Sequence, residues 1–526
     1  MRDRKQIIYS IGLLALVMLL RLPAFWTPIL DVDESQFAGY ANALIDGGTP
    51  FIASVDTKPI GIYYYFAIVF LIFGKNNMLA VHVITAIWVW LTAMYCYKIA
   101  KTIYTKQAGW FAAVFYAVFT TTYIPKFIST SIMIVLMLPL TISIYYMVRW
   151  ERTRNYGSLF VAGIFFGLAC LFKYQAGINL VLAAAYFIVL APLYLKDKTR
   201  PKLKPFLIFA IGGVLIGFVF LAYLKFSGLW NDFYFWSIVG SVTYIDAGIQ
   251  TSDFFRRLFM RGGFFVISSF LIWFFAGKQI LYLVRSARNK VFPKTPETCL
   301  VASWLFISFI PVCAGGRFFG HYFIQLIPAL SILAACSVAR TIVSRPWNAK
   351  RTQQIWTAIV LAMAIPAVSF FTARLYAGDI YKAIGEDDPE AYRPLGEYIK
   401  KRTSPDDRIF VWGFATPVYF FAERMQASRF LWCDWLTGRI SGSPTARDES
   451  FDTSSYSTKG SWKMLFEDLD KNKPVYIVDT SPGNYHDYGK YPIDNYQSLV
   501  RYLDKYYGLE AKYKGAHFYR RKEEER

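Results

Sequence analysis

The chain has 526 residues, of which 55% are hydrophobic, and a formal charge of +21. This composition is too apolar for an ordinary soluble domain and excludes a disordered or fibrous chain. Residues 374–526 carry 24 basic and 24 acidic residues, so the whole excess charge belongs to residues 1–373, mostly in short loops between apolar runs. That distribution excludes the basic surface of a nucleic-acid-binding domain.

Apolar runs recur from the amino terminus to about residue 373. Each is long enough, or nearly so, to cross a hydrocarbon core of roughly 30 Å as an α-helix. The pattern predicts an α-helical polytopic membrane protein with eleven transmembrane helices. The expected spans are 7–23, 78–97, 107–125, 127–148, 155–172, 174–195, 205–224, 262–284, 298–314, 318–339 and 353–373.

Residues 59–74 form a further uncharged segment that is marginal as a span. If this segment lies in the membrane interface, the basic amino terminus and five later basic loops all face the cytoplasm. If it crossed the membrane, the basic amino terminus and the later basic loops would lie on opposite sides, which the positive-inside tendency disfavours. We therefore expect an interfacial segment, a cytoplasmic amino terminus and an exterior carboxyl terminus.

The hydrophobic runs stop near Ala373. We predict a transmembrane domain over residues 1–373 and an exterior domain over residues 374–526, in which short strands alternate with helices as in a small α/β layer. The expected strands are 409–412, 475–478 and 517–519, and the expected helices are 389–402, 416–424, 462–470 and 493–506.

Most acidic residues of residues 1–373 are expected on the outer side, and five of them crowd into the first outer loop. They are Asp31, Asp33, Glu34, Asp46 and Asp56, and Lys58 follows them. Further cations expected on this side include Lys126, Lys173, Arg256, Arg257, Arg261 and Arg317. A carboxylate that takes a proton, close to cations that hold an anion, suits sugar transfer from a lipid phosphate. A phosphate leaves without protonation, so one base suffices, whereas a glycosidase needs two carboxylates.

Each candidate also has a structural interpretation. Asp33 and Glu34 could cap an interfacial helix, and Lys58 could extend its ammonium to lipid headgroups. The four histidines are scattered and lack zinc-ligand spacing, so no zinc site is expected. We expect no cofactor, and whether the protein needs a metal ion stays open.

Several short motifs carry a family resemblance over residues 1–373. They are Asp33-Glu34, the small-residue segment Phe37 to Leu44, Gly47-Gly48, Lys58-Pro59, Phe73-Gly74, Phe172-Lys173, and Arg317 with His321-Tyr322 and Pro328. This order resembles the GT-C superfamily, and within it the branch of protein O-mannosyltransferases and bacterial lipid A aminoarabinose transferases, known as glycosyltransferase family 39. Gln36 stands where the aminoarabinose transferases have an arginine.

The resemblance implies a polyprenyl-phosphate sugar donor, an active site at the outer membrane face, inversion at the anomeric carbon, interfacial helices in the first outer loop and Asp33 as catalytic base. Glu34 is its expected partner. The donor phosphate is expected at Lys58, Lys173, Arg256, Arg257 and Arg317. The sugar or acceptor is expected at Asp56, His321 and Tyr322. The acceptor could be a lipid, a polysaccharide or a protein, and the expected location is a bacterial inner membrane.

Two other function classes remain open. The same charges could line the pathway of a transporter or flippase of lipid-linked sugars, although the acids gather in one loop and no inverted repeat is visible. A non-catalytic assembly protein is the third possibility.

Overall fold

A computed structural model describes residues 2–122, 126–195, 201–242, 251–288, 296–343, 388–443, 446 and 448–523. The chain divides into two compact units. The first, here called the helical unit, comprises Met1–Trp26, His82–Ser227 and Thr251–Leu375. The second, here called the mixed unit, comprises Thr27–Val81, Gly228–Gln250 and Tyr376–Arg526.

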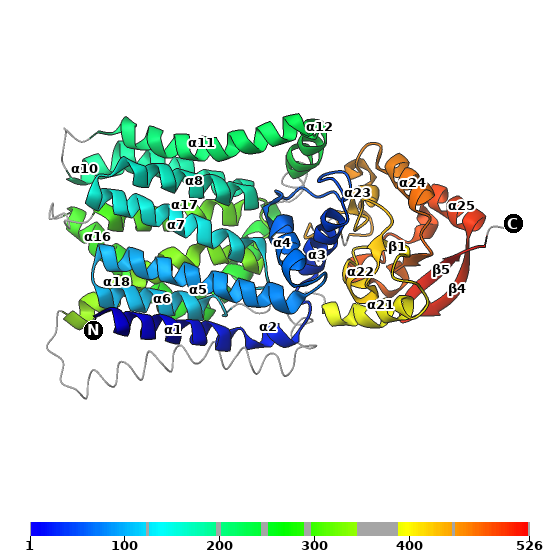
Figure 1. Cartoon of the computed structure of the whole chain (residues 1–526), viewed down its shortest axis with the longest axis horizontal. Coiled ribbons are helices and arrows are strands. Elements are labelled where there is room, and N and C mark those ends of the chain that lie inside the picture. Colours follow the sequence, from blue (N-terminus) through cyan, green and yellow to red (C-terminus); the bar gives the residue numbers. More distant parts are fainter. Residues whose placement is uncertain are drawn as a thin grey trace. The chain divides into compact units, whose positions relative to one another are not determined.

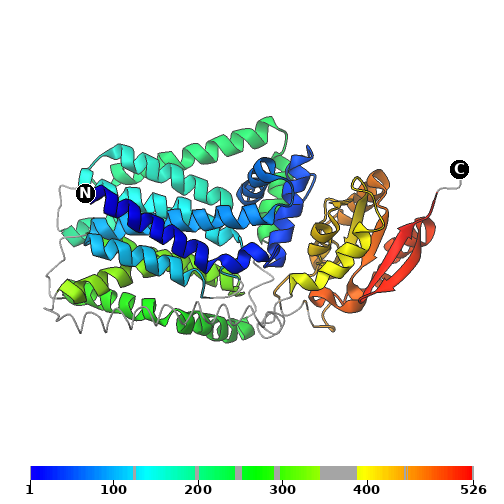
Figure 2. The ribbon, with the colours of Figure 1, turned by 60° about the horizontal axis from the view of Figure 1, so that its bottom comes forward.

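The helical unit consists of long helices that lie side by side (Figures 1 and 2). Its α-helices are α1 (Arg2–Leu20), α2 (Leu22–Trp26), α5 (Met78–Ile103, which begins in the mixed unit), α6 (Lys106–Phe119), α7 (Ile132–Thr153), α8 (Tyr156–Phe172), α9 (Asn179–Ala184), α10 (Ala191–Leu195), α11 (Leu203–Phe226), α14 (Thr251–Arg257), α15 (Gly263–Ser268), α16 (Phe270–Arg288), α17 (Pro296–Cys313) and α18 (Ile327–Val343). Shorter 3-10 or π-helical pieces are η1 (Tyr174–Ile178), η2 (Ala185–Leu190), η4 (Leu258–Gly262) and η5 (Gly320–Leu326).

Helices α8 and α11 pack closely because glycines face each other at their crossing. A Cβ atom at Gly163 would lie 2.0 Å from the carbonyl oxygen of Phe209, and one at Gly212 would lie 2.3 Å from that of Phe160. Small residues that let two backbones approach are typical of helix pairs in membranes.

Among the described residues, six helices are long and apolar enough to cross a membrane, or seven if a bent pair counts as one span. That pair, Asp253–Ser268 and Phe270–Ser286, meets at 89° where residues 262–284 were expected as one span. The expected spans 107–125 and 155–172 correspond to helices of 14 and 17 residues, α6 and α8. The expected span 353–373 lies outside the described residues, so the prediction of eleven spans stays a prediction.

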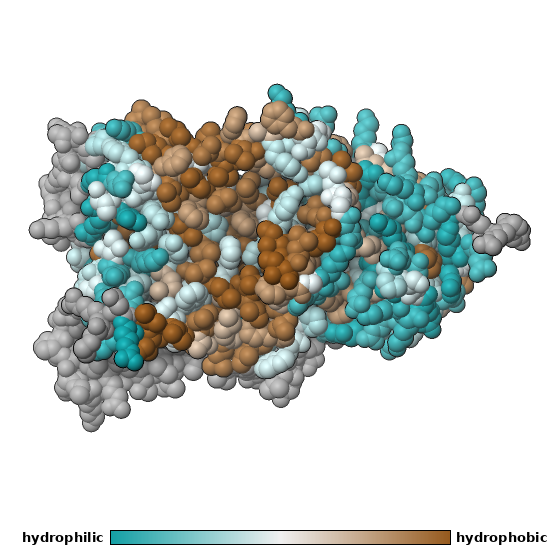
Figure 3. All heavy atoms as spheres, viewed as in Figure 1, coloured by the Kyte–Doolittle hydropathy of each residue, from teal (hydrophilic) through white to brown (hydrophobic). Residues whose placement is uncertain are grey.

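The surface of the helical unit is strongly apolar (Figure 3). On α11, for example, Ile211, Val214 and Phe218 are 57%, 67% and 66% exposed. Side chains of this kind are stable at a surface when lipid covers them. The chain is therefore a multi-pass membrane protein.

The mixed unit combines the first loop with the carboxyl-terminal residues. The loop contributes α3 (Val32–Ile45) and α4 (Gly61–Phe73), and residues 228–250 contribute α12 (Trp230–Phe233) and the π-helical η3 (Tyr234–Val239). With 13 residues, α4 is about 20 Å long, which is too short to cross a bilayer alone.

The carboxyl-terminal part holds a five-stranded mixed sheet in the order β2-β1-β3-β5-β4. The strands are β1 (Arg408–Trp412), β2 (Met425–Gln426), β3 (Tyr476–Asp479), β4 (Tyr507–Tyr513) and β5 (Ala516–Arg521). Strand β1 is parallel to β2 and β3, whereas β5 pairs antiparallel with β3 and β4. The helices include η6 (Pro389–Tyr392), α21 (Arg393–Lys400), α22 (Pro417–Ala422), α23 (Asp434–Thr437), α24 (Ser461–Asn472), η11 (Ile493–Asn495) and α25 (Gln497–Tyr506).

The predicted α/β pattern of this part is confirmed. The strands expected at 409–412, 475–478 and 517–519 correspond to β1, β3 and β5, and each expected helix has a counterpart. The sequence missed β4 because most of its residues are exposed, so this edge strand has no buried apolar run. It missed β2 because that strand has only two residues.

Candidate active site

The start of α3 is fixed by two neighbouring carboxylates. Asp31 is the N-cap, and its Oδ1 accepts a hydrogen bond from the backbone N–H of Asp33 at 3.1 Å. Glu34 is 0% exposed, and its Oε2 accepts from the N–H of Leu30 at 2.7 Å. The first contact satisfies a backbone donor that the helix start leaves without an intrahelical partner, and the second fixes the residue before the N-cap. The capping interpretation therefore applies to Asp31, and Glu34 ties down the chain before the helix.

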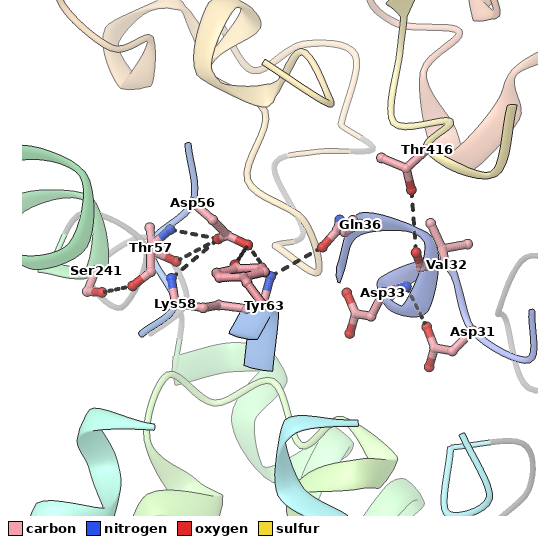
Figure 4. Close-up of polar contacts among 10 residues, drawn as sticks. All are labelled: Asp31, Val32, Asp33, Gln36, Asp56, Thr57, Lys58, Tyr63, Ser241 and Thr416. Carbon is pink, nitrogen blue, oxygen red and sulfur yellow. Dashed lines mark hydrogen bonds and ion pairs between the residues drawn. The ribbon is translucent and has the colours of Figure 1, made fainter. Parts of the chain in front are cut away.

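Asp33 lies in the first turn of α3 and is half-buried. Its carboxylate points away from that of Asp31 (Figure 4). The charge of Asp33 acts on Tyr63 of α4. The pKa of Tyr63 is raised well above its usual value, mainly by burial, then by the carboxylate of Asp56 and more weakly by that of Asp33. Asp33 is thus a half-buried carboxylate whose charge acts on Tyr63, the residue that also donates to Asp56.

The carboxylate of Asp56 is buried and bonded to neighbouring donors. Its Oδ2 accepts from the Lys58 ammonium at 2.9 Å and from the Tyr63 hydroxyl at 2.5 Å, and its Oδ1 accepts from the Thr57 N–H at 2.6 Å. The Asp56 side chain is only 3% exposed. Asp56 was expected to contact a sugar or acceptor, but in this structure it holds Lys58 and Tyr63 in place (Figure 4).

Lys58 is surrounded by groups that suit a cation. Its ammonium donates to Gln36 Oε1 at 3.3 Å in addition to Asp56. It also lies 5.7 Å from the ring centroids of both Phe37 and Trp432, within the range of a cation–π interaction. The side chain is 27% exposed, so a ligand has access to it.

The helical unit contains a separate group of cations around the segment that joins α17 to η5. The Lys173 ammonium lies 4.2 Å from the ring centroid of Tyr322. Arg261 donates from Nη1 to the carbonyl oxygen of Arg317 at 2.9 Å, and its guanidinium lies 5.4 Å from the ring centroid of Phe319. The segment can turn here because Gly315 and Gly316 adopt positive φ angles of 78° and 62°.

His321 completes the aromatic part of this group. Its ring stacks on Phe319 with centroids 6.0 Å apart and meets Tyr322 edge-on at 4.8 Å. Arg317 is 2% exposed and His321 is half-buried. Lys173, Arg317, His321 and Tyr322, which the sequence singled out, therefore lie in one connected cluster with Arg261.

Arg256 and Arg257 have a different environment. Arg256 Nη2 lies 2.9 Å from Asp253 Oδ1, and Arg257 Nη2 lies 3.5 Å from Asp253 Oδ2. The Arg256 side chain is 65% exposed, whereas that of Arg257 is 17% exposed. Both arginines pair with an acid three or four residues earlier on the same helix, an arrangement that also occurs on helix surfaces without function.

The candidate residues therefore form one set in each unit. Asp33, Glu34, Asp56 and Lys58 belong to the mixed unit, and Lys173, Arg256, Arg257, Arg317, His321 and Tyr322 belong to the helical unit. Sequence reasoning missed Gln36, Tyr63 and Trp432 as neighbours of Lys58. Tyr63 had a weak signal, since it follows Lys58 on the next helix, but nothing in the sequence links Trp432 to that site. Within the part of the chain that the structure describes, no group of three or more His, Cys, Asp or Glu side chains could hold a metal ion.

One family model matches part of the chain. Residues 57–224 match the family described as dolichyl-phosphate-mannose-protein mannosyltransferase (PMT_2). No curated protein sequence matches the chain significantly.

Solved structures of membrane glycosyltransferases have the same fold. ArnT from Cupriavidus metallidurans bound to undecaprenyl phosphate aligns with a TM-score of 0.58 at 15% identity, covering 98% of each chain. The archaeal oligosaccharyltransferase AglB from Archaeoglobus fulgidus, in complex with an inhibitory peptide and a dolichol-phosphate, aligns with a TM-score of 0.53 at 15% identity, covering 99% of this chain and 74% of AglB. The chain thus has the same fold as these two solved structures, and about a third of it matches the PMT_2 family.

Proposed function

We propose that this protein is an integral membrane glycosyltransferase that transfers a sugar from a polyprenyl-phosphate donor to an acceptor on the outer face of the membrane. The observation that carries the proposal is the arrangement at α3: Asp33 is accessible there, and Lys58 is held nearby by the buried carboxylate of Asp56. The lipid phosphates bound in the ArnT and AglB structures support a donor of this class.

Asp33 acts as the general base in this proposal. Its carboxylate takes the proton of the acceptor hydroxyl or amine while that atom attacks the anomeric carbon and the bond to the phosphate oxygen breaks. A single displacement of this kind inverts the configuration of the anomeric carbon. Glu34 is less suited to the role because it is fully buried and bonded to the N–H of Leu30.

Cations stabilise the departing phosphate. Lys58 supplies one positive charge, oriented by its ion pair with Asp56. The proposed phosphate-binding candidates of the helical unit are Lys173, Arg317 and Arg261. Arg257, whose side chain is 17% exposed, is a better candidate there than Arg256, which is 65% exposed. Fixed cations stabilise charge as it develops without reorganisation during the reaction. His321 and Tyr322 are the proposed contacts for the sugar or acceptor.

The proposed location is a bacterial inner membrane, with the amino terminus in the cytoplasm and the carboxyl-terminal residues outside. The charge distribution between the spans is the basis of this orientation. Lipid, polysaccharide and protein remain possible acceptors.

The test is turnover of the purified protein with a panel of polyprenyl-phosphate sugars and cell-envelope acceptors. Asp33→Asn should bind undecaprenyl phosphate normally but lose about 10²- to 10⁴-fold in turnover, the usual contribution of a general base. Asp46→Asn is the matched control, because Asp46 lies in the same loop and pairs with Lys75. Undiminished turnover by Asp33→Asn would refute the base assignment, and lipid movement across liposomes without a covalent product would favour a flippase.

A further inference from the structure

Residues 414–435 of the carboxyl-terminal part contact the loop that carries Asp33 and Lys58. The N–H of Val55, next to Asp56, donates to the carbonyl oxygen of Arg429 at 3.2 Å. A Cβ atom at Gly39 of α3 would lie 2.9 Å from the side chain of Leu431, so the two segments are in close contact. The loop therefore depends on this segment for its local structure.

The segment itself is tied to the sheet. The N–H of Ala427 donates to the carbonyl oxygen of Ile409 at 2.8 Å, and that of Cys433 donates to Gly413 at 3.0 Å. Asp468 holds Arg429 with bonds of 2.9 Å to Nε and 2.8 Å to Nη2. Residues 427–433 are thus anchored on one side to β1 and α24 and contact the first loop on the other.

Trp432 is the residue of this segment that contacts Lys58. It is 6% exposed, and its ring centroid lies 5.7 Å from the Lys58 ammonium. The ring packs against Phe414 at 5.7 Å and Trp435 at 6.1 Å. Such contacts leave the indole few alternative orientations, because buried aromatic rings are closely packed.

A buried ion pair supports Phe414 in turn. Phe414 stacks on His486 at 4.4 Å, and the Arg439 guanidinium lies 5.6 Å from the Phe414 ring. Arg439 is 3% exposed and forms an ion pair with Asp434 at 3.2 Å. The carboxyl-terminal part therefore builds a rigid support that contacts the Lys58 ammonium through Trp432.

We propose that Trp432 is a positioning residue for Lys58. Together with Phe37, it fixes the ammonium group that donates hydrogen bonds to Asp56 and Gln36. The carboxyl-terminal part is thereby a component of the transferase site. The relevance for catalysis rests on the proposed function, whereas the contact itself does not. The inference assigns residues 414–435 the role of orienting the donor-phosphate cation.

The first test measures the lysine directly. Acetylation of the full-length protein with an N-hydroxysuccinimide ester, followed by mass spectrometry, gives the relative reactivity of each lysine. Trp432→Leu should raise the reactivity of Lys58 by about 2- to 30-fold, the range that corresponds to loss of a cation–π contact, while Trp432→Phe should change it less. Lys463, whose side chain is 83% exposed, is the internal reference.

Trp462→Leu is the matched control variant. Trp462 packs against Trp412 and Tyr496 in the same part of the chain, so its loss should reduce stability without changing Lys58. Equal Lys58 reactivity in Trp432→Leu and the wild type, or an equal rise in Trp462→Leu, would overturn the proposal. If Trp432→Leu does not fold, the same comparison is made with Trp432→Phe and Trp432→Met.

The second test uses sugar transfer. Trp432→Leu should lower kcat more than it changes the KM for the acceptor. In a protein that already carries Lys58→Met, adding Trp432→Leu should have little further effect on the affinity for undecaprenyl phosphate. Additive effects of the two substitutions would show that Trp432 does not act through Lys58. Absence of transfer by the wild type would refute the proposed function and leave the labelling result valid.

Discussion

Ser35 and Thr416 are 381 positions apart in the sequence, yet their hydroxyl groups share a hydrogen bond of 2.6 Å. Ser35 also donates to the carbonyl oxygen of Val32 at 2.7 Å, in the first turn of α3. The Thr416 hydroxyl lies 3.4 Å from the same oxygen (Figure 4). The turn that carries Asp33 is therefore held by a residue at the start of α22. This relationship makes the carboxyl-terminal part relevant to the proposed base as well as to Lys58.

Thr416→Val should clearly lower the kcat of sugar transfer while reducing the free energy of unfolding only slightly. The valine keeps the volume but removes the hydroxyl, at a cost of about 1 kcal/mol for one lost hydrogen bond. We expect kcat to fall by roughly 3- to 10-fold because the Asp33 turn is less well fixed. Thr453→Val is the control, since Thr453 is also buried and donates to the carbonyl oxygen of Thr437. Equal loss of turnover in both variants would exclude a specific role for Thr416.

The Glu34 side chain should prove to have a structural role and not a catalytic one. Glu34→Gln keeps an oxygen that can accept from Leu30, so it should retain at least about half of the turnover. Glu34→Ala leaves the buried N–H of Leu30 without this acceptor and should cost about 1–3 kcal/mol of stability. Thermal unfolding and turnover of both variants, compared with Asp33→Asn, separate the roles. A Glu34→Gln variant as inactive as Asp33→Asn would instead make Glu34 catalytic.

Arg261 should matter more than Arg256 for transfer. Arg261 donates to the backbone of Arg317, whereas the Arg256 side chain is 65% exposed and paired with Asp253. Arg261→Ala should lower kcat/KM by about 10- to 100-fold, as expected for loss of a charged hydrogen bond, and Arg256→Ala by less than about 2-fold. The reverse order in a steady-state assay would place the phosphate nearer to α14.

The pH dependence of local stability around β3 should follow Asp479. Burial raises the pKa of Asp479 to about 6. The ordinary value is about 3.9, so the folded protein binds this proton more tightly than the unfolded chain. Protonated Asp479 makes its full contribution to the free energy of unfolding below about pH 4. This contribution is lost as the pH rises through 6, so ionisation of the carboxylate lowers the free energy of unfolding by about 1–3 kcal/mol.

Asp479→Asn removes this titration and keeps an oxygen that can accept from the N–H of Ser481. Amide hydrogen exchange of β3 should therefore be slower in the variant than in the wild type at pH 7.5, with a smaller difference at pH 5. Asp504→Asn, at an exposed carboxylate, is the control. Identical protection of wild type and Asp479→Asn at pH 7.5 would contradict the raised pKa.

The sequence could predict helices and strands whose pattern of buried and exposed residues stays the same from end to end. Strands β1 and β3 are short apolar runs buried at nearly every position, and α21 places Leu395 and Ile399 on one buried face. Strand β4 could not be recognised, because an edge strand with exposed polar side chains has no such pattern. The number of membrane-spanning helices was harder to predict, since α6 and α8 are shorter than the apolar runs in which they lie.

The candidate site was predictable in part for a related reason. Charged residues next to apolar segments are rare and costly, which singled out Asp33, Lys58, Lys173 and Arg317. The sequence could not show which of the adjacent residues Asp33 and Glu34 is buried, because packing alone decides this. Trp432 could not be found at all, since the sequence has 15 tryptophans and its contact with Lys58 depends on the tertiary fold.

The bond between Ser35 and Thr416 has a consequence for how the protein is made. At a synthesis rate of about 5–20 residues per second, the second hydroxyl leaves the ribosome roughly 20 to 75 seconds after the first. During that interval the nascent chain has inserted its early helices but lacks the partner that completes the first turn of α3. Premature termination before residue 414 should therefore yield a membrane-inserted chain in which Ser35 lacks this partner, and α3 reaches its final local structure only after the last segment has been made and folded.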